Sequence, residues 1–356
     1  MYIKEIDLQN FRNYSMQKVK LDKGINIFYG DNAQGKTNLL EAIFLCSIGK
    51  SFRTNRDREL INFNNDYSNI EISFEKKDRC GKINLRIDDK KRFLVNNVPV
   101  KKTSEIIGNI YIVLFTPDDI NILKNGPSKR RRFLDIMISQ LRPKYIYSLN
   151  QYNRIISQRN AYLKQIRFSD VNNNLLDIWD ENLSIYGEKI HNYREEFIKK
   201  ITNKINYIHG NITNKNEKID IQYIYNFKDK KDFLDKLKYN RKLDIKTGIT
   251  NAGIQREDFN VSINGKKLNL YGSQCQHRTV VLSLKISELE IIKEELEEKP
   301  ILLLDDFMSE LDFKRRFNLL NLMKDNQVII TCTDKEAFSK QDIKPKYFYV
   351  NNGIIK

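Results

Sequence analysis

The sequence predicts an α/β protein in which one domain is assembled from both chain ends and a mainly helical domain is inserted between them. Three observations indicate this fold. Strand patterns alternate with helix patterns near both termini, helix patterns dominate the middle, and a phosphate-loop motif near the start is matched by an acidic strand end near the finish. We therefore expect domain I to comprise residues 1–117 and 240–356, and domain II to comprise residues 118–239.

Composition excludes several classes of protein. The chain has 356 residues, is 40% hydrophobic and carries a formal net charge of +16. These values support a packed core and favour nucleic acid as the leading partner class, because a positive surplus attracts phosphates. No stretch approaches the ~18 apolar residues of a membrane span, and the N-terminus is not a signal peptide. The four scattered cysteines indicate neither a zinc site nor a disulfide framework, so we expect a protein of the reducing cytosol without a membrane partner.

The N-terminal elements follow from apolar spacing. Continuous or alternating apolar residues predict strands near residues 3–8, 19–21, 24–29, 69–76, 82–88 and 110–115. Residues 37–48 instead have the spacing of a helix, with Leu39, Leu40, Ile43 and Phe44 on one side. The segment VNNVP at residues 95–99 predicts a turn.

The middle of the chain has mainly helix patterns, and the C-terminal part alternates between strand and helix patterns. Pro127 and Pro143 stand where long helices begin in the block 118–239. This block holds 23 basic and 15 acidic residues, so its surplus of eight is half of the net charge. Beyond it, the patterns predict strands near residues 260–263, 301–306, 327–331 and 346–352, and helices at residues 274–298 and 312–324.

The clearest motif matches G-x-x-x-x-G-K-[ST] between a predicted strand and a predicted helix. It consists of Gly30, Asp31, Asn32, Ala33, Gln34, Gly35, Lys36 and Thr37, followed by Asn38. The glycines let successive N–H groups point at phosphate oxygens, and the helix dipole favours the same anion. Lys36 would contact the β- and γ-phosphates, and the Thr37 hydroxyl would bind Mg²⁺. The motif therefore predicts an ATP–Mg²⁺ site.

A phosphate loop needs an acidic partner for the metal. The apolar run at residues 301–304 ends in Asp305, which we expect to hold Mg²⁺, and Asp306, which is placed to orient or deprotonate the attacking water. The alternative is a buried strand that ends in a solvated acidic turn. Lys36 and Asp305 are 269 positions apart, which is typical of phosphate-loop proteins with a large inserted module.

Several segments, in this order along nearly the whole chain, resemble the RecF family of bacterial recombination mediators. They are LQNFRNY at 8–14, GDNAQGKTNLLEAI at 30–43, GKSFR at 49–53, FTPDDINILKNGPSKRRRFLD at 115–135 and LLLDDFMSELD at 302–312. The resemblance implies a phosphate-loop head of the ABC/SMC ATPase type, with Ser309–Asp312 as its D-loop. It also implies a signature motif at Tyr271–Thr279, YGSQCQHRT.

In this superfamily the signature of one subunit caps the γ-phosphate held by the other. The resemblance assigns this contact to Ser273, Gln274 and Arg278, with the dipole of the following helix behind them. The chain departs from the family pattern by having Cys275 where Gly is usual and His277 where Gln is usual. A glycine permits close approach of the backbone, so the departure weakens the expectation of hydrolysis activated across a dimer, but not that of ATP binding.

The resemblance implies an ATP-bound homodimer that binds gapped, duplex or single-strand DNA without sequence specificity. It also implies weak DNA-stimulated ATPase activity and help in loading RecA recombinase, together with RecO and RecR proteins, in repair, replication-fork maintenance and SOS induction. A transporter-type ATPase subunit coupled to another, non-DNA or membrane partner is the alternative. The strand at 327–331 is followed by Cys332 and Thr333 rather than by the switch histidine that transporters usually have.

The surface that contacts DNA has two candidates. The run Lys129–Arg132 could contact phosphates or could start a helix and serve a structural role, and Arg53, Arg56 and Arg58 form a second basic group. Tyr145, Tyr147, Tyr152 and Tyr162 lie among arginines, a pattern that can stack bases but more often forms a core stripe. No base-reading motif occurs, so we expect contacts with the DNA backbone.

Overall fold

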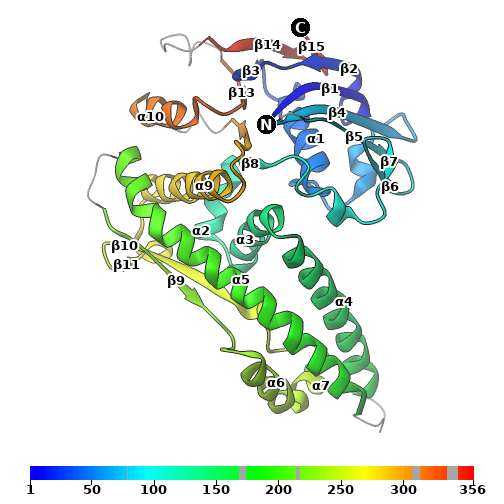
Figure 1. Ribbon diagram of the computed structural model, residues 1–356, viewed down its shortest axis with the longest axis vertical. Helices are drawn as coiled ribbons and strands as arrows, with labels where there is room; N and C mark the ends of the chain where they lie inside the picture. The colour runs from blue at the N-terminus through cyan, green and yellow to red at the C-terminus, as the bar shows by residue number, and fades with distance from the viewer. Residues whose placement is uncertain (78, 168–173, 214–216, 307–312, 335–343) are drawn as a thin grey trace. The chain divides into compact units, whose positions relative to one another are not determined.

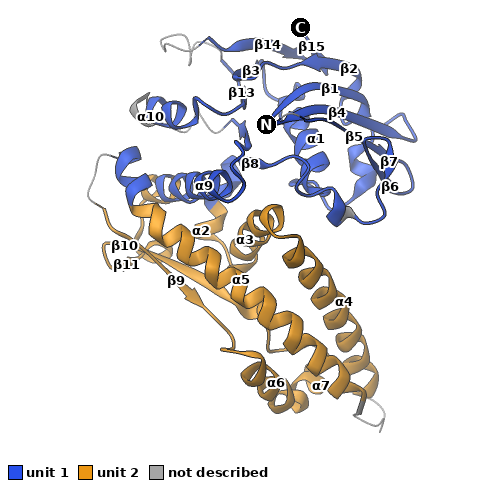
Figure 2. Ribbon diagram, viewed as in Figure 1, with its two compact units in different colours: residues 1–120, 207–215, 279–356 blue, residues 121–206, 216–278 orange. Residues whose placement is uncertain are grey.

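The computed structural model describes residues 1–77, 79–167, 174–213, 217–306, 313–334 and 344–356. The chain divides into two compact units, which Figure 2 colours separately. Unit 1 comprises residues 1–120, 207–215 and 279–356, and unit 2 comprises residues 121–206 and 216–278. Unit 1 therefore draws its sheets from both ends of the chain.

Unit 1 contains an antiparallel sheet from the first hundred residues (Figure 1). Its strands are β1 (Tyr2–Phe11), β2 (Tyr14–Lys20), β4 (Ser68–Lys76), β5 (Arg79–Ile87), β6 (Lys91–Val95) and β7 (Val98–Pro99), in the order β2-β1-β4-β5-β6-β7. Alternate residues of β4, such as Ile70, Ile72 and Phe74, are buried. This period of two places one face of the sheet on the core.

A second, mainly parallel sheet joins the two chain ends. Its strands are β3 (Ile25–Tyr29), β8 (Ile112–Phe115), β12 (Ile301–Asp305), β13 (Val328–Cys332), β14 (Lys346–Asn351) and β15 (Ile354–Ile355), in the order β15-β14-β3-β13-β12-β8. The strands β8, β12 and β13 are buried at every position, as expected where both faces are covered. Because β3 and β12 both lie beside β13 and run parallel to it, their carboxyl ends meet at one edge of the sheet.

Helix α1 (Lys36–Ile48) contacts strands of both sheets. Eleven of its residues are buried, Lys36, Glu41 and Ser47 among them, so the helix is enclosed on all sides rather than exposed along one face. The other regular elements of unit 1 are α10 (Phe313–Met323), the last part of α9 (Gln274–Leu296), the end of α5 (Asn174–Thr213), and the short 3₁₀ helices η1 (Asp57–Leu60), η2 (Thr103–Glu105) and η3 (Pro117–Ile120).

Unit 2 is mainly helical. It contains α2 (Asn121–Lys124), α3 (Pro127–Leu141), α4 (Pro143–Ile166), most of α5, α6 (Lys230–Tyr239), α7 (Arg241–Thr247), η4 (Ile254–Arg256), α8 (Leu268–Tyr271) and the start of α9. Pro127 and Pro143 begin α3 and α4, as the sequence predicts. None of the described helices has the length and apolarity to cross a membrane.

A small antiparallel sheet lies within the helical unit. It consists of β9 (Ile219–Ile224), β10 (Asp258–Ile263) and β11 (Lys266–Lys267), in the order β11-β10-β9. The sequence prediction ends domain II at residue 239 and overlooks β9, whereas unit 2 continues to residue 278. The physical reason is that all six residues of β9 pair with β10, so the two strands belong to the same compact unit.

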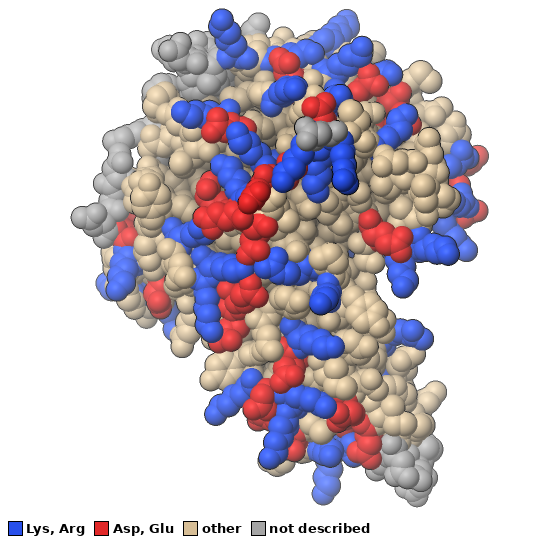
Figure 3. All heavy atoms as spheres, in the orientation of Figure 1, with Lys and Arg blue, Asp and Glu red and all other residues tan. Residues whose placement is uncertain are grey.

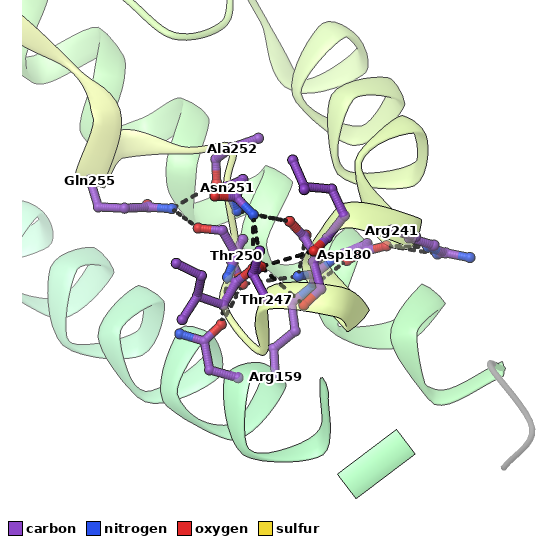
Figure 4. Close-up of polar contacts among 12 residues, drawn as sticks. Arg159, Asp180, Arg241, Thr247, Thr250, Asn251, Ala252 and Gln255 are labelled. Carbon is purple, nitrogen blue, oxygen red and sulfur yellow. Dashed lines mark hydrogen bonds and ion pairs between the residues drawn. The ribbon is translucent and has the colours of Figure 1, made fainter. Parts of the chain in front are cut away.

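A buried ion-pair network ties the helices of unit 2 together (Figure 4). The Arg159 side chain is fully buried, and its guanidinium donates to Asp180 at 2.7 Å, to Asp244 at 2.8 Å and to the Thr250 hydroxyl at 2.9 Å. Arg241 donates to Asp180 from the other side at 2.7 Å. The network joins α4, α5 and α7, so these helices depend on one another.

Candidate functional site

The phosphate loop connects β3 to α1, as the motif requires. Its backbone demands glycine at two positions. Gly30 has φ +149° and Gly35 has φ +116°, which side chains rarely permit. A Cβ at Gly30 would lie 2.3 Å from the Val350 carbonyl oxygen, and one at Gly35 would lie 2.6 Å from Nδ2 of Asn13. The loop therefore packs closely against Val350 and Asn13, with no room for a side chain at either glycine.

Lys36 lies folded over this loop. Its side chain is 7% exposed, and its Nζ donates to the carbonyl oxygens of Gly30 and Asp31 at 2.6 Å each. Burial lowers the pKa of Lys36, and Asp306 is the strongest of the nearby charges that oppose this shift. The ammonium group is thus placed at the loop, where an anionic oxygen would compensate its lost hydration.

Thr37 and Asp305 bring the two chain ends together. The Thr37 hydroxyl donates to Asp305 Oδ1 at 2.7 Å, and the Thr331 hydroxyl donates to the same oxygen at 2.9 Å. Burial raises the pKa of Asp305, and these two hydrogen bonds partly counteract the rise. A hydroxyl beside a carboxylate is a hard oxygen donor set of the kind that Mg²⁺ prefers, so these residues fit the predicted metal.

Asp306 follows in a strained conformation. Its φ is +47°, in the left-handed region that few non-glycine residues occupy. Its N–H donates to Thr331, to the hydroxyl oxygen at 3.0 Å and to the carbonyl oxygen at 3.2 Å. Thr331 thus supports both acidic residues, and the left-handed residue Asp306 follows Asp305 directly. The predicted D-loop, Ser309–Asp312, lies outside the described residues.

Two turns hold the loop from outside its motif. The Asn13 amide donates to the Gln34 carbonyl oxygen at 2.8 Å, and Gly353 N–H donates to the same oxygen at 3.0 Å. The Tyr14 hydroxyl donates to the Gly35 carbonyl oxygen at 2.9 Å. These residues, at the turns between β1 and β2 and between β14 and β15, carry no phosphate-loop signal. Asn13 and Tyr14 fall in the segment 8–14 that carries the family resemblance, but the sequence does not connect them with the loop.

Asn38 connects this clamp to a buried carboxylate. Its amide donates to Asn13 Oδ1 at 2.8 Å, and its Oδ1 accepts from Arg53 at 2.6 Å. Arg53 and Arg12 both pair with Glu41, which is fully buried on α1. The Arg12 pair is bidentate, at 2.9 and 2.8 Å. Arg53 is therefore part of a network that reaches the phosphate loop, in addition to being partly exposed.

The signature residues belong to unit 2, whereas the phosphate loop belongs to unit 1. Ser273 and Gln274 are exposed and Arg278 is half-buried at the first turn of α9. Ser273 Oγ accepts from the Gln276 N–H at 3.2 Å, while Gln276 Oε1 accepts from the Ser273 N–H at 3.0 Å. This reciprocal pair is a capping box, which starts the helix. Within unit 1, the structure brings together Lys36, Thr37, Asp305 and Asp306.

Two of the four residues in the basic run 129–132 make structural contacts, whereas Lys129 and Arg132 are exposed. Arg130 makes a bidentate pair with Asp258 at 2.6 and 2.9 Å and also donates to two backbone carbonyls. Arg131 donates to the Glu257 carbonyl oxygen at 2.9 Å, and burial lowers its pKa. By contrast, the side chains of Arg56 and Arg58 are 84% and 63% exposed.

The tyrosines of the helical unit mostly form the core. Tyr145, Tyr152 and Tyr162 are buried, and Tyr147 is 54% exposed. The core interpretation therefore holds for three of the four. On the face of the molecule in Figure 3, basic and acidic side chains are interspersed, so this face is not a uniformly basic surface.

Fold and site together define a phosphate-loop ATPase head of the ABC/SMC type, which confirms the predicted fold class. The model of the RecF/RecN/SMC N-terminal domain matches residues 2–356. DNA replication and repair protein RecF of Alkaliphilus oremlandii is 43% identical over 369 residues and covers 100% of both chains. The RecF protein of Acetivibrio thermocellus is 42% identical over 353 residues and covers 96% of both. The chain therefore belongs to the RecF family.

Solved structures agree with this membership. The recombination mediator protein RecF with ATP, of the RecFOR pathway, has a TM-score of 0.93 and 39% identity, over 100% of this chain and 97% of that one. An Smc head domain from Pyrococcus furiosus has a TM-score of 0.58 and 17% identity, over 100% and 95% of the respective chains. The latter likeness shows the fold alone.

Proposed function

We propose that this chain binds ATP and Mg²⁺ at the phosphate loop, closes as a homodimer around the nucleotides, and in that state binds DNA. The observation that carries the proposal is the hydrogen bond between Thr37 and Asp305, which places a hydroxyl and a carboxylate from the two chain ends beside the loop. Membership of the RecF family and the ATP-bound structure of a RecF relative support it.

Each predicted site residue has a role in this proposal. Backbone N–H groups of the loop residues, from Gly30 to Asn38, bind the phosphates, and Lys36 exchanges its carbonyl contacts for the β- and γ-phosphate oxygens. Thr37 and Asp305 hold Mg²⁺. Asp306 orients the attacking water. Ser273, Gln274 and Arg278 of the second copy contact the γ-phosphate.

The DNA part of the proposal concerns gapped or junction DNA, bound without sequence specificity. The net charge of +16 and the exposed Arg56 and Arg58 support contacts with the phosphate backbone. The RecFOR pathway named for the solved relative supports RecO and RecR proteins as partners. From the family resemblance we further propose that the chain helps to load RecA recombinase in repair, replication-fork maintenance and SOS induction. We expect weak, DNA-stimulated hydrolysis and association with the nucleoid.

Sedimentation velocity with and without ATP tests dimer closure. The wild type should change from monomer to dimer with ATP, whereas Lys36→Met and Ser273→Arg should stay monomeric. Ser273→Arg should still bind ATP, because it leaves the phosphate loop intact. A wild type that stays monomeric with every nucleotide would contradict the proposal.

DNA binding measured against salt tests the second part. The logarithm of the affinity should fall steeply with the logarithm of the salt concentration, and only when ATP is present. Gapped, duplex and single-strand DNA of equal length show the preferred structure, and their effects on ATP hydrolysis show the stimulation. Salt-independent binding, or none, would point to a different partner for this ATPase.

A further inference from the structure

The capping box at the start of α9 leaves the Ser273 hydroxyl able to donate a hydrogen bond. Its oxygen already accepts a hydrogen bond from the Gln276 N–H, at 3.2 Å. The hydroxyl proton of Ser273 is not used in that bond, so the exposed side chain can act as a donor. A donor suits a phosphate oxygen, which can only accept. The geometry of this turn therefore decides where the donor points.

His277 holds the same turn from its buried side. Its Nδ1 lies 2.9 Å from the Ser273 carbonyl oxygen, which also accepts the backbone N–H of His277 at 3.0 Å. Because a carbonyl oxygen only accepts, Nδ1 must carry the proton in this contact. The residue is 4% exposed, and its Nε2 has no hydrogen-bond partner among the described residues. A buried acceptor without a partner destabilises a fold, so the ring contributes through its Nδ1 bond and its packing.

The packing around the ring is close. Gly272 precedes the capping serine, and its N–H donates to the Leu268 carbonyl oxygen at 2.8 Å. A Cβ at Gly272 would lie 2.6 Å from that oxygen and 2.9 Å from Cε1 of His277. The imidazole therefore packs against the backbone of the turn, which leaves no room for a side chain at position 272. Ser273 is held between a side-chain bond on its exposed side and a ring on its buried side.

We propose that His277 is a positioning residue, which fixes the Ser273 carbonyl through Nδ1 and so aims the Ser273 hydroxyl at the nucleotide of a second copy. His277 itself does not contact that nucleotide. The proposal rests on the proposed function, because the target of the hydroxyl is the γ-phosphate in an ATP-bound dimer. In this proposal His277 acts by orienting Ser273, and its contribution to the stability of the core is not what the reaction depends on.

Two substitutions separate the Nδ1 bond from the volume of the ring. His277→Ala removes both. His277→Asn also removes most of the ring but keeps a donor at the position of Nδ1, because Nδ2 of asparagine and Nδ1 of histidine are the same number of bonds from the backbone. His209→Ala is the matched control, since His209 is fully buried and its Nδ1 contacts the Ser283 hydroxyl at 3.0 Å instead.

The first measurement needs no nucleotide. Hydrogen exchange at the amides of Gln276 and His277 should be about 3- to 10-fold faster in His277→Ala, the factor expected when one hydrogen bond is removed. It should be close to wild type in His277→Asn and unchanged in His209→Ala. Wild-type exchange in His277→Ala, or equal acceleration in His277→Ala and His277→Asn, would overturn the proposal.

The second measurement uses ATP. His277→Ala should lower kcat and ATP-dependent dimerisation about 3- to 10-fold with ATP affinity unchanged, and His277→Asn should restore both. A fall in kcat that follows thermal stability across all three variants, the His209 control included, would overturn the positioning role. If the wild type itself does not dimerise with ATP, the proposed function is wrong, and the Ser273 hydroxyl then has no γ-phosphate of a second copy to contact. The exchange result still decides whether His277 fixes the turn.

Discussion

The Thr37 hydroxyl donates a 2.7 Å hydrogen bond to the Asp305 carboxylate across a sequence separation of 268 residues. Thr37 lies at the start of α1, and Asp305 lies at the end of β12. The contact exists because β3 and β12 both run parallel to β13, which brings the carboxyl ends of strands from opposite chain ends to one edge. The fold therefore builds the candidate metal site from two local motifs.

Asp305→Asn should stabilise the protein while removing its function. Burial raises the pKa of Asp305, so the folded state binds a proton more readily than the unfolded state does. The stability that this provides is full below the ordinary pKa of 3.8 and is lost as pH rises through the raised pKa. At pH 7 the ionised group is therefore a cost, and Asn should raise the free energy of unfolding by about 0.5–2 kcal/mol.

Thermal melts from pH 4 to pH 8 measure this difference, which should shrink as the pH falls. Mg²⁺-dependent ATP binding should be lost in Asp305→Asn at every pH. In the wild type this binding should weaken on acidification, at a higher pH than for an ordinary aspartate. A variant that is less stable than the wild type at pH 7 would contradict the expected sign.

Lys36→Met should abolish tight ATP binding without unfolding the loop. The ammonium group donates to two loop carbonyls, and its bonds to phosphate should be worth about 1.5–3 kcal/mol, or roughly 10- to 150-fold in affinity. Equilibrium binding of a fluorescent ATP analogue measures the loss. Lys23→Met, at an exposed turn of the same unit, should bind as the wild type does.

Asn13→Ala should weaken ATP binding although Asn13 lies outside the motif. Its side chain bonds the Gln34 carbonyl and Asn38, and the removal of two hydrogen bonds of about 1 kcal/mol each predicts an affinity lower by about 10- to 30-fold. Isothermal titration measures this change. The matched control is Asn109→Ala, whose amide also bonds backbone carbonyls but away from the loop. Equal losses in both variants would indicate general destabilisation.

Arg159→Ala should destabilise unit 2. Removing the guanidinium leaves Asp180 and Asp244 buried without their shared cation, and breaking a buried pair costs about 3–5 kcal/mol. Denaturant unfolding followed by the fluorescence of Trp179 measures the loss. Arg154→Ala, at an exposed position of the same helix, should change stability by less than about 0.5 kcal/mol. Similar values for the two variants would mean that the network adds no stability.

The two basic groups should respond differently to substitution. Arg56→Ala with Arg58→Ala should lower the salt dependence of DNA binding by about two units of slope, since each phosphate that an arginine neutralises on duplex DNA adds about 0.9. Their exposed side chains motivate this expectation. Arg130→Ala should instead lower the melting temperature, because it breaks a bidentate pair with Asp258. Fluorescence anisotropy at several salt concentrations measures the slope, and a thermal melt measures the stability of Arg130→Ala. An unchanged slope in the double variant would exclude its arginines from the DNA interface.

Local patterns explain why much of the fold and site could be predicted. A phosphate loop is a continuous segment whose glycines are required by its own backbone, as the φ values of Gly30 and Gly35 show. The buried strand before Asp305 is likewise visible as an apolar run, because both faces of the parallel sheet are covered. By contrast, β9 is a short alternating segment, IDIQYI at 219–224, within a block of helix patterns, and its pairing with β10 about forty positions later is not a local feature of the sequence.

The sequence by itself determined the chemistry of the phosphate loop, the acidic strand end and the assembly of one domain from both chain ends, because each rests on residues that are adjacent or periodic in the chain. Only the tertiary structure decided which other residues support the site and which basic residues serve the fold instead. Thr331 supports Asp305, Asn13 clamps Gln34, and Arg130 is committed to Asp258. These roles depend on hydrogen bonds between distant segments, and a hydrogen bond is set by distance and direction in space rather than by position along the chain.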